Sequence, residues 1–115
     1  MMRNVILLVS ALLLAQSIEA RSILEKPPKR TYVSRFSAGD VGQCLTVRMH
    51  WFAPATLAPA PEGSMRVQFS HQGRLFTDVL ITPGPQTSIE VRGFASGRVD
   101  RTIKSCVEQP IGVRL

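Results

Sequence analysis

Histidine and cysteine are scarce in this chain, which has 115 residues and only two of each. A three-histidine zinc site is therefore impossible, and a mixed metal site would need carboxylates gathered near the histidines. The acidic residues are instead scattered singly, which also leaves no pair suited to glycoside hydrolysis. The sequence contains no Gly-x-Ser-x-Gly elbow and no glycine-rich phosphate loop. These absences predict that the protein is not an enzyme and uses neither a metal nor another cofactor.

Aromatic residues are also few: five Phe, one Trp and one Tyr, too dispersed to predict a stacking platform for single-stranded nucleic acid. Positive charge is abundant by contrast, with 14 Lys and Arg against 8 Asp and Glu and a net charge of +6. Such a charge allows non-specific binding to nucleic acid. An exported protein does not meet nucleic acid in its compartment, however, so we do not expect nucleic acid as a physiological partner.

A long apolar run occurs only near the N-terminus, where residues 5–15 are apolar apart from Ser10. A short basic start, this apolar run and the small residue Ala20 predict a cleavable secretory signal over residues 1–20. The run is shorter than the roughly 20 apolar residues that span a bilayer. We therefore expect a secreted or periplasmic protein with no transmembrane segment in its mature chain.

Cys44 and Cys106 are the only cysteines. An even number of cysteines in a small exported domain predicts that they form a structural disulfide. Neither lies in a Cys-x-x-Cys motif, so the spacing does not indicate a redox pair.

The remaining chain divides into two parts. Residues 21–30 are basic and interrupted by Pro27 and Pro28, which limits any helix to the first few positions and predicts a flexible leader. Within it, Lys29-Arg30 is either part of a solvated tail or a dibasic processing site. Residues 31–115 are expected to form a single β domain.

The clearest alternation of apolar and polar residues runs from Cys44 to Trp51 and predicts a half-buried strand. His71-Gln72-Gly73 fits a three-residue hairpin loop with Gly73 in the left-handed conformation. Strands are expected at 32–36, 44–51, 65–70, 74–81, 88–95 and 98–107, with a short edge strand at 111–115. Residues 52–63 are expected to be irregular because of their prolines.

Short strands at regular spacing predict an all-β fold, a small antiparallel β-sandwich or partly open barrel of six or seven strands with one disulfide. The strand spacing and the distant cystine resemble, in a general way, those of immunoglobulin-like exported sandwiches. If the strands that carry the two cysteines pair antiparallel, His50 comes to lie opposite Asp100. A small hydrolase using His50 and Asp100 is the least favoured of three functional hypotheses.

Three arginines, Arg48, Arg66 and Arg92, occupy mid-strand positions on the polar face and are expected to form an Arg-rich, anion-compatible surface. Around Phe76 and Leu80 the sequence is apolar on both faces, which indicates a strand covered on both sides or an exposed edge. These features favour an exported accessory protein, a subunit or chaperone of an envelope or extracellular assembly, that binds a protein partner through a sheet edge and the Arg-rich face. An anionic surface or polysaccharide is a second class of partner. The alternative is a secreted inhibitor or effector that binds a foreign protein through the Pro/Ala-rich loop from Pro54 to Pro61.

Overall fold

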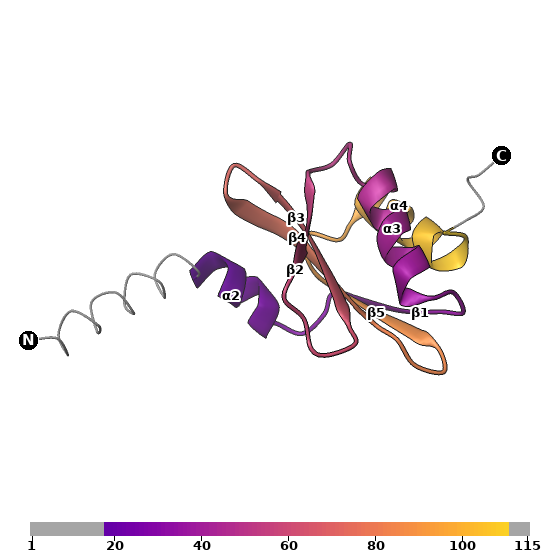
Figure 1. Cartoon of the computed structure of the whole chain (residues 1–115). Coiled ribbons are helices and arrows are strands. Elements are labelled where there is room, and N and C mark those ends of the chain that lie inside the picture. Colours follow the sequence, from indigo (N-terminus) through magenta and orange to yellow (C-terminus); the bar gives the residue numbers. More distant parts are fainter. Residues whose placement is uncertain (1–17, 111–115) are drawn as a thin grey trace, which may run out of the picture.

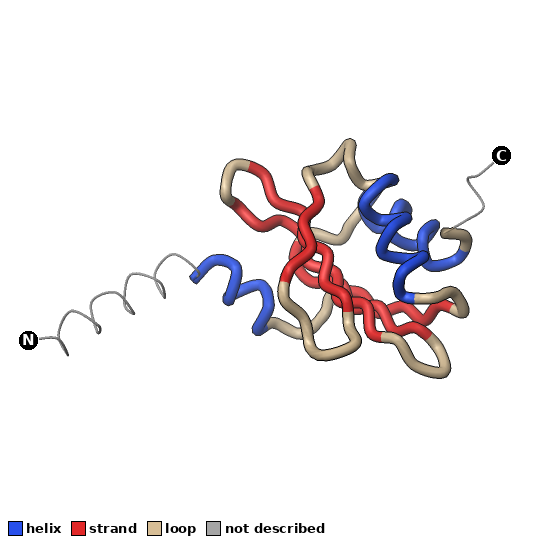
Figure 2. Tube along the Cα trace, viewed as in Figure 1, coloured by secondary structure: helices blue, strands red, loops and turns tan. Residues whose placement is uncertain are grey.

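The computed structural model describes residues 18–110, and within them one five-stranded antiparallel sheet and three helices are present (Figures 1 and 2). In chain order the elements are α2 (Ile18–Glu25), β1 (Arg30–Ser34), α3 (Ala38–Arg48), β2 (Ala55–Ala58), β3 (Met65–His71), β4 (Arg74–Thr82), β5 (Thr87–Gly93) and α4 (Gly97–Glu108). The sheet order is β1-β5-β4-β3-β2, so β4 is central and β1 and β2 are the edges. Helices α3 and α4 pack against one face of the sheet, and α2 lies on the other side against β4 and β5.

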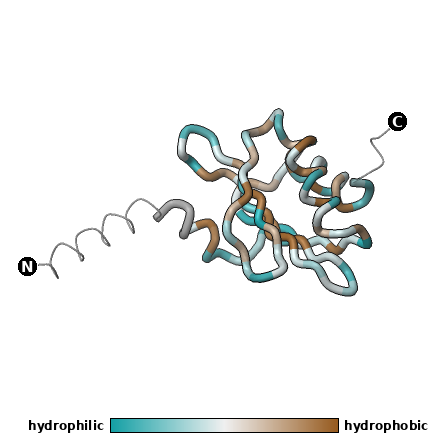
Figure 3. Tube along the Cα trace, in the orientation of Figure 1, coloured by the Kyte–Doolittle hydropathy of each residue, from teal (hydrophilic) through white to brown (hydrophobic). Residues whose placement is uncertain are grey.

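The three central strands confirm the alternation seen in the sequence. Side chains on the face covered by α3 and α4 are fully buried along β3, β4 and β5, and Figure 3 shows the apolar stretches that run through the sheet. They are Val67, Phe69, Val79, Ile81, Ile89 and Val91. Burial of each such side chain stabilises the fold by about 1.5–3 kcal/mol, so this layer dominates the core.

The hairpin between β3 and β4 forms where the sequence predicts it. His71 pairs with Arg74, which leaves a loop of Gln72 and Gly73 alone rather than the expected three residues. Both loop residues have positive φ, 52° and 75°, as a type I′ turn requires. The left-handed conformation predicted for Gly73 is thus confirmed.

The strand predicted at 44–51 is wrong, because this segment lies mainly in helix α3. Ser37 is the N-cap residue just before this helix, and its side-chain oxygen accepts a hydrogen bond from the Asp40 amide in the first turn. Val41 and Leu45 in the helix and Met49, its C-cap residue, are fully buried at intervals of four residues and face the sheet.

The strand predicted at 98–107 is also wrong, because Gly97–Glu108 is helix α4. Val99, Ile103, Cys106 and Val107 are buried and follow the spacing of one helical face. The predicted β-rich fold with one antiparallel sheet is therefore confirmed, but the fold is not exclusively β, because α3 and α4 cover one face of that sheet. In the described residues the strands form one sheet of five, and its second layer is helical, so no second sheet packs on it as a sandwich would need.

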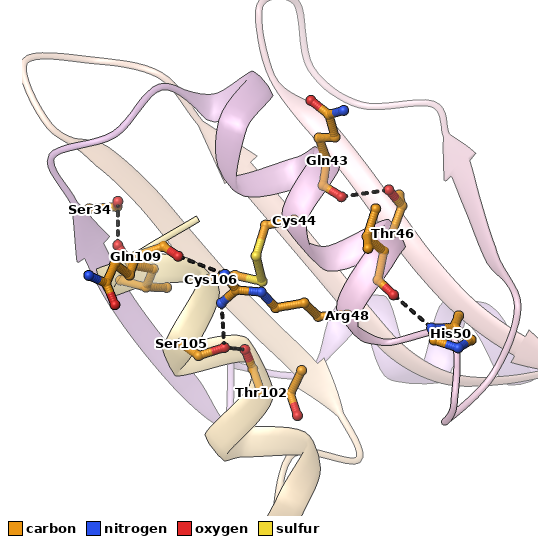
Figure 4. Close-up of a disulfide and its surroundings, with 12 residues drawn as sticks. Ser34, Gln43, Cys44, Thr46, Arg48, His50, Thr102, Ser105, Cys106 and Gln109 are labelled. Atoms are coloured by element: carbon orange, nitrogen blue, oxygen red, sulfur yellow. Dashed lines mark hydrogen bonds between the residues drawn. A yellow bond between two sulfur atoms is a disulfide. The ribbon is translucent and has the colours of Figure 1, made fainter. Parts of the chain in front are cut away.

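The disulfide between Cys44 and Cys106 is confirmed, with the two Cα atoms 5.6 Å apart. It joins the facing sides of α3 and α4 rather than two strands, as Figure 4 shows. The antiparallel register that would set His50 opposite Asp100 is therefore absent.

The predicted leader has a defined course in the structure. Helix α2 ends at Glu25, before Pro27 and Pro28, as the prolines require. The Lys29 amide then donates to the Val91 carbonyl at 2.8 Å, and β1 starts at Arg30. The dibasic pair thus lies at the entrance of a paired strand.

Two predicted segments lie wholly or mostly outside the described residues. The secretory signal covers 1–20, of which only 18–20 are described, and the short edge strand was expected at 111–115. Within the described part, no helix is long and apolar enough to cross a membrane.

Candidate partner-binding site

Arg66 lies on the outer face of the sheet, the face opposite α3 and α4. Its Nη1 donates to Asp78 Oδ2 at 2.7 Å, and its Nε donates to the Pro59 carbonyl at 3.2 Å. Gln68 Nε2 donates to the other carboxylate oxygen of Asp78 at 3.1 Å. Since Asp78 is fully buried, Arg66 serves as its counter-charge within the sheet.

Arg92 lies on the same outer face, one strand beyond Asp78. Its Nη2 is 3.7 Å from Glu90 Oε2, and its Nε donates to the Lys26 carbonyl at 2.9 Å. Its side chain, like that of Arg66, is only about one-sixth exposed. The sheet thus brings Arg66 and Arg92 onto one face, as the sequence predicts, but an acid beside each balances its charge.

Arg48 does not join them, because it lies on the last turn of α3 and not on a strand. Its Nη1 donates to Ser105 Oγ at 3.0 Å and its Nη2 to the Gln109 carbonyl at 2.9 Å (Figure 4). These bonds tie the end of α3 to the end of α4 beside the disulfide. The Arg-rich face predicted from three arginines is therefore divided between two sides of the molecule.

Leu80 is half-buried on the outer face of β4. β4 is the central strand, and helices pack against it on both faces of the sheet. For Leu80 this confirms the first of the two alternatives, a strand covered on both faces, and not an exposed edge. The free sheet edges are instead β1, where Val33 is 60% exposed, and β2, where Leu57 is 69% exposed.

Phe76 sits at an irregularity in the same strand. Phe69 pairs with Thr77 but the next residue, Ser70, pairs with Leu75, so Phe76 is an extra residue in β4. The Phe76 carbonyl accepts a hydrogen bond from the Phe94 amide at 2.8 Å. This bulge places the two phenylalanines together at one end of the sheet.

Two further aromatic residues complete a cluster there. Phe52 follows α3, held by a hydrogen bond from its amide to the Met49 carbonyl at 2.9 Å. Its ring centroid is 6.0 Å from that of Phe76, 5.8 Å from that of Phe94 and 5.8 Å from that of Trp51. We call Trp51, Phe52, Phe76 and Phe94 the aromatic patch.

The aromatic patch reaches the protein surface. Phe94 is 48% exposed and Trp51 is 37% exposed. Arg98, in the first turn of α4, lies over the Trp51 ring with its guanidinium carbon 4.0 Å from the ring centroid. Aromatic residues and Arg are enriched in protein interfaces, and Trp and Arg are among the types that contribute most of the binding energy.

The sequence gives little sign of this patch. Its members come from the segment after α3, from a bulge in β4 and from the end of β5, and only Trp51 and Phe52 are adjacent. The scarcity and dispersion of the aromatic residues predict no stacking platform for single-stranded nucleic acid and do not indicate that four of these rings meet in space. Phe76 is the one residue of the patch that sequence reasoning selected for partner binding.

The residues of the hydrolase hypothesis have separate contacts. His50 Nδ1 lies 2.7 Å from the Val47 carbonyl at the end of α3. Asp100 instead accepts a hydrogen bond from the Tyr32 hydroxyl and lies 3.7 Å from Arg30 Nε. Burial, followed by the hydrogen bond and the charge of Asp100, raises the pKa of Tyr32 to about 12. This group of side chains joins α4 to β1 and gives His50 no carboxylate partner.

The segment from Pro54 to Pro61, expected to be an irregular loop, contains the edge strand β2. The Pro54 carbonyl accepts from the Ser70 amide at 3.3 Å, and β2 pairs with β3 from Ala55 to Ala58. The first part of the segment, through Ala58, is therefore attached to the sheet and presents Leu57 to solvent.

No protein-family model, curated protein or solved structure matches this chain. Among residues 18–110, no three His, Cys, Asp or Glu side chains gather where they could hold a metal ion.

Proposed function

We propose that this chain is an exported, non-enzymatic binding protein that holds a protein partner through the aromatic patch. The observation that carries the proposal is the contact of Trp51, Phe52, Phe76 and Phe94 at the surface, with Arg98 stacked on Trp51. The secretory signal expected over residues 1–20 supports the exported compartment, and the disulfide is compatible with it.

The chemistry of the patch defines the class of partner. Aromatic rings packed against one another offer a rigid apolar surface that loses little conformational entropy on binding. Arg98 adds a positive charge beside that surface, and the whole chain carries a net charge of +6. The matching partner is a protein segment that combines apolar side chains with carboxylates, which Arg98 would bind in addition to Trp51.

The test compares surfaces within one fold. The protein partner would be captured from the exported fraction, purified, and titrated against variants whose folding is checked by circular dichroism. We expect Trp51→Ala with Phe94→Ala to weaken binding by about 2 kcal/mol or more. Arg98→Gln, which leaves the rings in place, is expected to weaken it by a smaller amount.

Two control variants remove exposed apolar side chains elsewhere. Val33→Ser alters the β1 edge and Leu57→Ser alters the Pro54–Pro61 segment; both are expected to bind like the parent protein. Loss of binding in Val33→Ser alone would favour strand addition at β1, and loss in Leu57→Ser alone would favour the inhibitor hypothesis. A single-stranded oligonucleotide that binds through Trp51 more tightly than the captured protein would also contradict the proposal.

A further inference from the structure

We propose a second site, independent of the aromatic patch, that binds a phosphate or sulfate group in a hollow between the ends of α3 and α4. The hollow has a volume of about 310 Å³ and is lined by Arg48, Arg101, Lys104, Ser105, Glu108 and Gln109. We call it the basic hollow. Its size is at the lower end of the range for small-molecule sites, which is about 300–1,000 Å³.

The lining is unbalanced in charge. Arg48, Arg101 and Lys104 contribute three cations, and Glu108 contributes the one carboxylate. Within the described part of the chain, neither Arg101 nor Lys104 takes part in an ion pair. This distinguishes the hollow from the outer face of the sheet, where Arg66 and Arg92 each lie beside an acid. An anion that enters the hollow therefore meets cations whose charge is not already balanced.

Arg48 is held in place before any ligand arrives. Its hydrogen bonds to Ser105 Oγ and the Gln109 carbonyl fix the guanidinium at one end of α4 (Figure 4). They use two of the five N–H groups that a guanidinium carries, and the others stay available. Ser105 donates its own hydroxyl proton to the Thr102 carbonyl at 2.6 Å, so it supports Arg48 and does not itself bind the anion. Fixing Arg48 in advance lowers the entropy cost of binding.

The other two cations come from successive turns of one helix. Arg101 and Lys104 are three positions apart on α4, so they project from the same side of that helix. The disulfide between Cys44 and Cys106 holds α3 and α4 together, which keeps Arg48 beside them. Planar Arg donors and a Lys ammonium around one space suit a tetrahedral oxyanion with several acceptor oxygens. The ligand is therefore one that carries a phosphate or sulfate group.

Inorganic sulfate and phosphate are the probes for the first experiment. Each is titrated into the isotopically labelled protein at constant ionic strength, with chloride as the reference, and amide shifts are followed by NMR. We expect saturable shifts at Arg48, Arg101 and Lys104. Arg101→Gln is expected to weaken binding at least about fivefold, because an opposing charge near the anion is lost. Arg35→Gln, which removes the same charge from an exposed position elsewhere, should leave the affinity unchanged.

A second variant, expected to bind the anion more tightly, keeps the proposal testable if Arg101→Gln disturbs folding. Glu108→Gln removes the carboxylate of the hollow and should tighten sulfate binding roughly three- to tenfold. Glu62→Gln makes the same change in net charge at an exposed turn and should not. Equal responses within either matched pair would show that only overall charge matters, and would overturn the site. Two further results would overturn the site. One is NMR amide shifts spread over the whole basic surface; the other is a heparin oligosaccharide that binds more tightly than sulfate and whose affinity is unchanged by Arg101→Gln. None of these substitutions changes a residue of the aromatic patch. The anion site and the binding of a protein partner by the aromatic patch are therefore tested independently.

Discussion

Asp78, which is fully buried, accepts a hydrogen bond from Arg66 at 2.7 Å across the β3–β4 pair. A carboxylate in this position is tolerated only when its charge is matched and its oxygens are hydrogen-bonded. Arg66 supplies the charge and Gln68 supplies a further hydrogen bond. Around Asp78 the outer face of the sheet is therefore a hydrogen-bonded polar network and not an open cationic surface.

The first prediction concerns this pair. Arg66→Ala should lower the free energy of unfolding by about 3 kcal/mol, since it leaves a buried carboxylate without its counter-charge. Arg92→Ala is the matched control, because its partner Glu90 is one-third exposed and lies 3.7 Å away; its loss should be at most about 1 kcal/mol. Denaturant unfolding measures both. Equal losses would mean that the Arg66–Asp78 pair is no more important to the fold than a surface contact.

The disulfide gives the second prediction. Its two cysteines are 62 residues apart, so the cross-link removes much of the freedom of the unfolded chain. Replacing both cysteines by Ala should reduce the free energy of unfolding by about 4 kcal/mol in the chain-entropy model. Unfolding curves of the oxidised protein and of Cys44→Ala with Cys106→Ala provide the measurement. Detection of free thiols in the folded, untreated protein would contradict the cross-link itself.

Tyr32 gives the third prediction, which concerns pH. Its pKa is raised from 10.0 to about 12, first by burial and then by Asp100, so the fold favours the neutral phenol. The contribution of Tyr32 to stability is complete below pH 10, where the phenol is neutral in both states. It is lost between pH 10 and 12, where only the unfolded chain ionises.

The titration of Tyr32 can be observed directly because it is the only tyrosine. Ultraviolet absorbance of tyrosinate should show a midpoint near 12 in the folded protein and near 10 in denaturant. Asp100→Asn should move the folded midpoint part of the way toward 10, since the charge is removed but burial remains. A folded midpoint at 10 would show that the Tyr32–Asp100 contact between β1 and α4 does not form.

The central sheet could be predicted from sequence because its signals are local. Alternation in β3, β4 and β5 directly reports which side chains face the core, and Gly73 marks the turn between two of them. The cystine followed from the number of cysteines alone. Which elements it joins did not, because a disulfide carries no information on whether a cysteine lies on a strand or a helix.

Two segments expected to be strands form the helices α3 and α4, and the reason can be identified for each. In the window from Cys44 to Trp51, every second residue is apolar, and the helical series of Val41, Leu45 and Met49 appears only when the window begins earlier. In α4 the series from Val99 through Ile103 to Val107 is clear, but these β-branched residues also favour strands. Local propensity and helical period conflicted, and packing on the sheet decided the outcome.

The candidate site was harder still, because it depends on contacts between distant segments. Phe76 was selected from the apolar composition of its strand, whereas Trp51, Phe52 and Phe94 join it only through the turn after α3 and the bulge. Arg48 was expected on a sheet with Arg66 and Arg92. Once its segment folds as a helix, it faces α4 and the basic hollow instead.

The last prediction concerns Gly93, on which the bulge depends. Gly93 has a φ of 85°, and a Cβ atom built there would lie 2.2 Å from the Phe76 carbonyl oxygen. Gly93→Ala should therefore lower the free energy of unfolding by about 3 kcal/mol, from left-handed strain together with the overlap. Gly63 has nearly the same φ, 82°, but no atom near its Cβ position, so Gly63→Ala isolates the strain and should cost about 1 kcal/mol.

Thermal or denaturant unfolding of the two variants measures this difference. Because the Phe94 amide bonds to the same Phe76 carbonyl that Gly93 approaches, a shift there also moves two rings of the aromatic patch. Gly93→Ala should thus weaken partner binding under conditions in which it is still folded, whereas Gly63→Ala should not. Similar losses of stability in both variants would show that the backbone relaxes easily at the bulge, and the patch would then not need glycine at position 93.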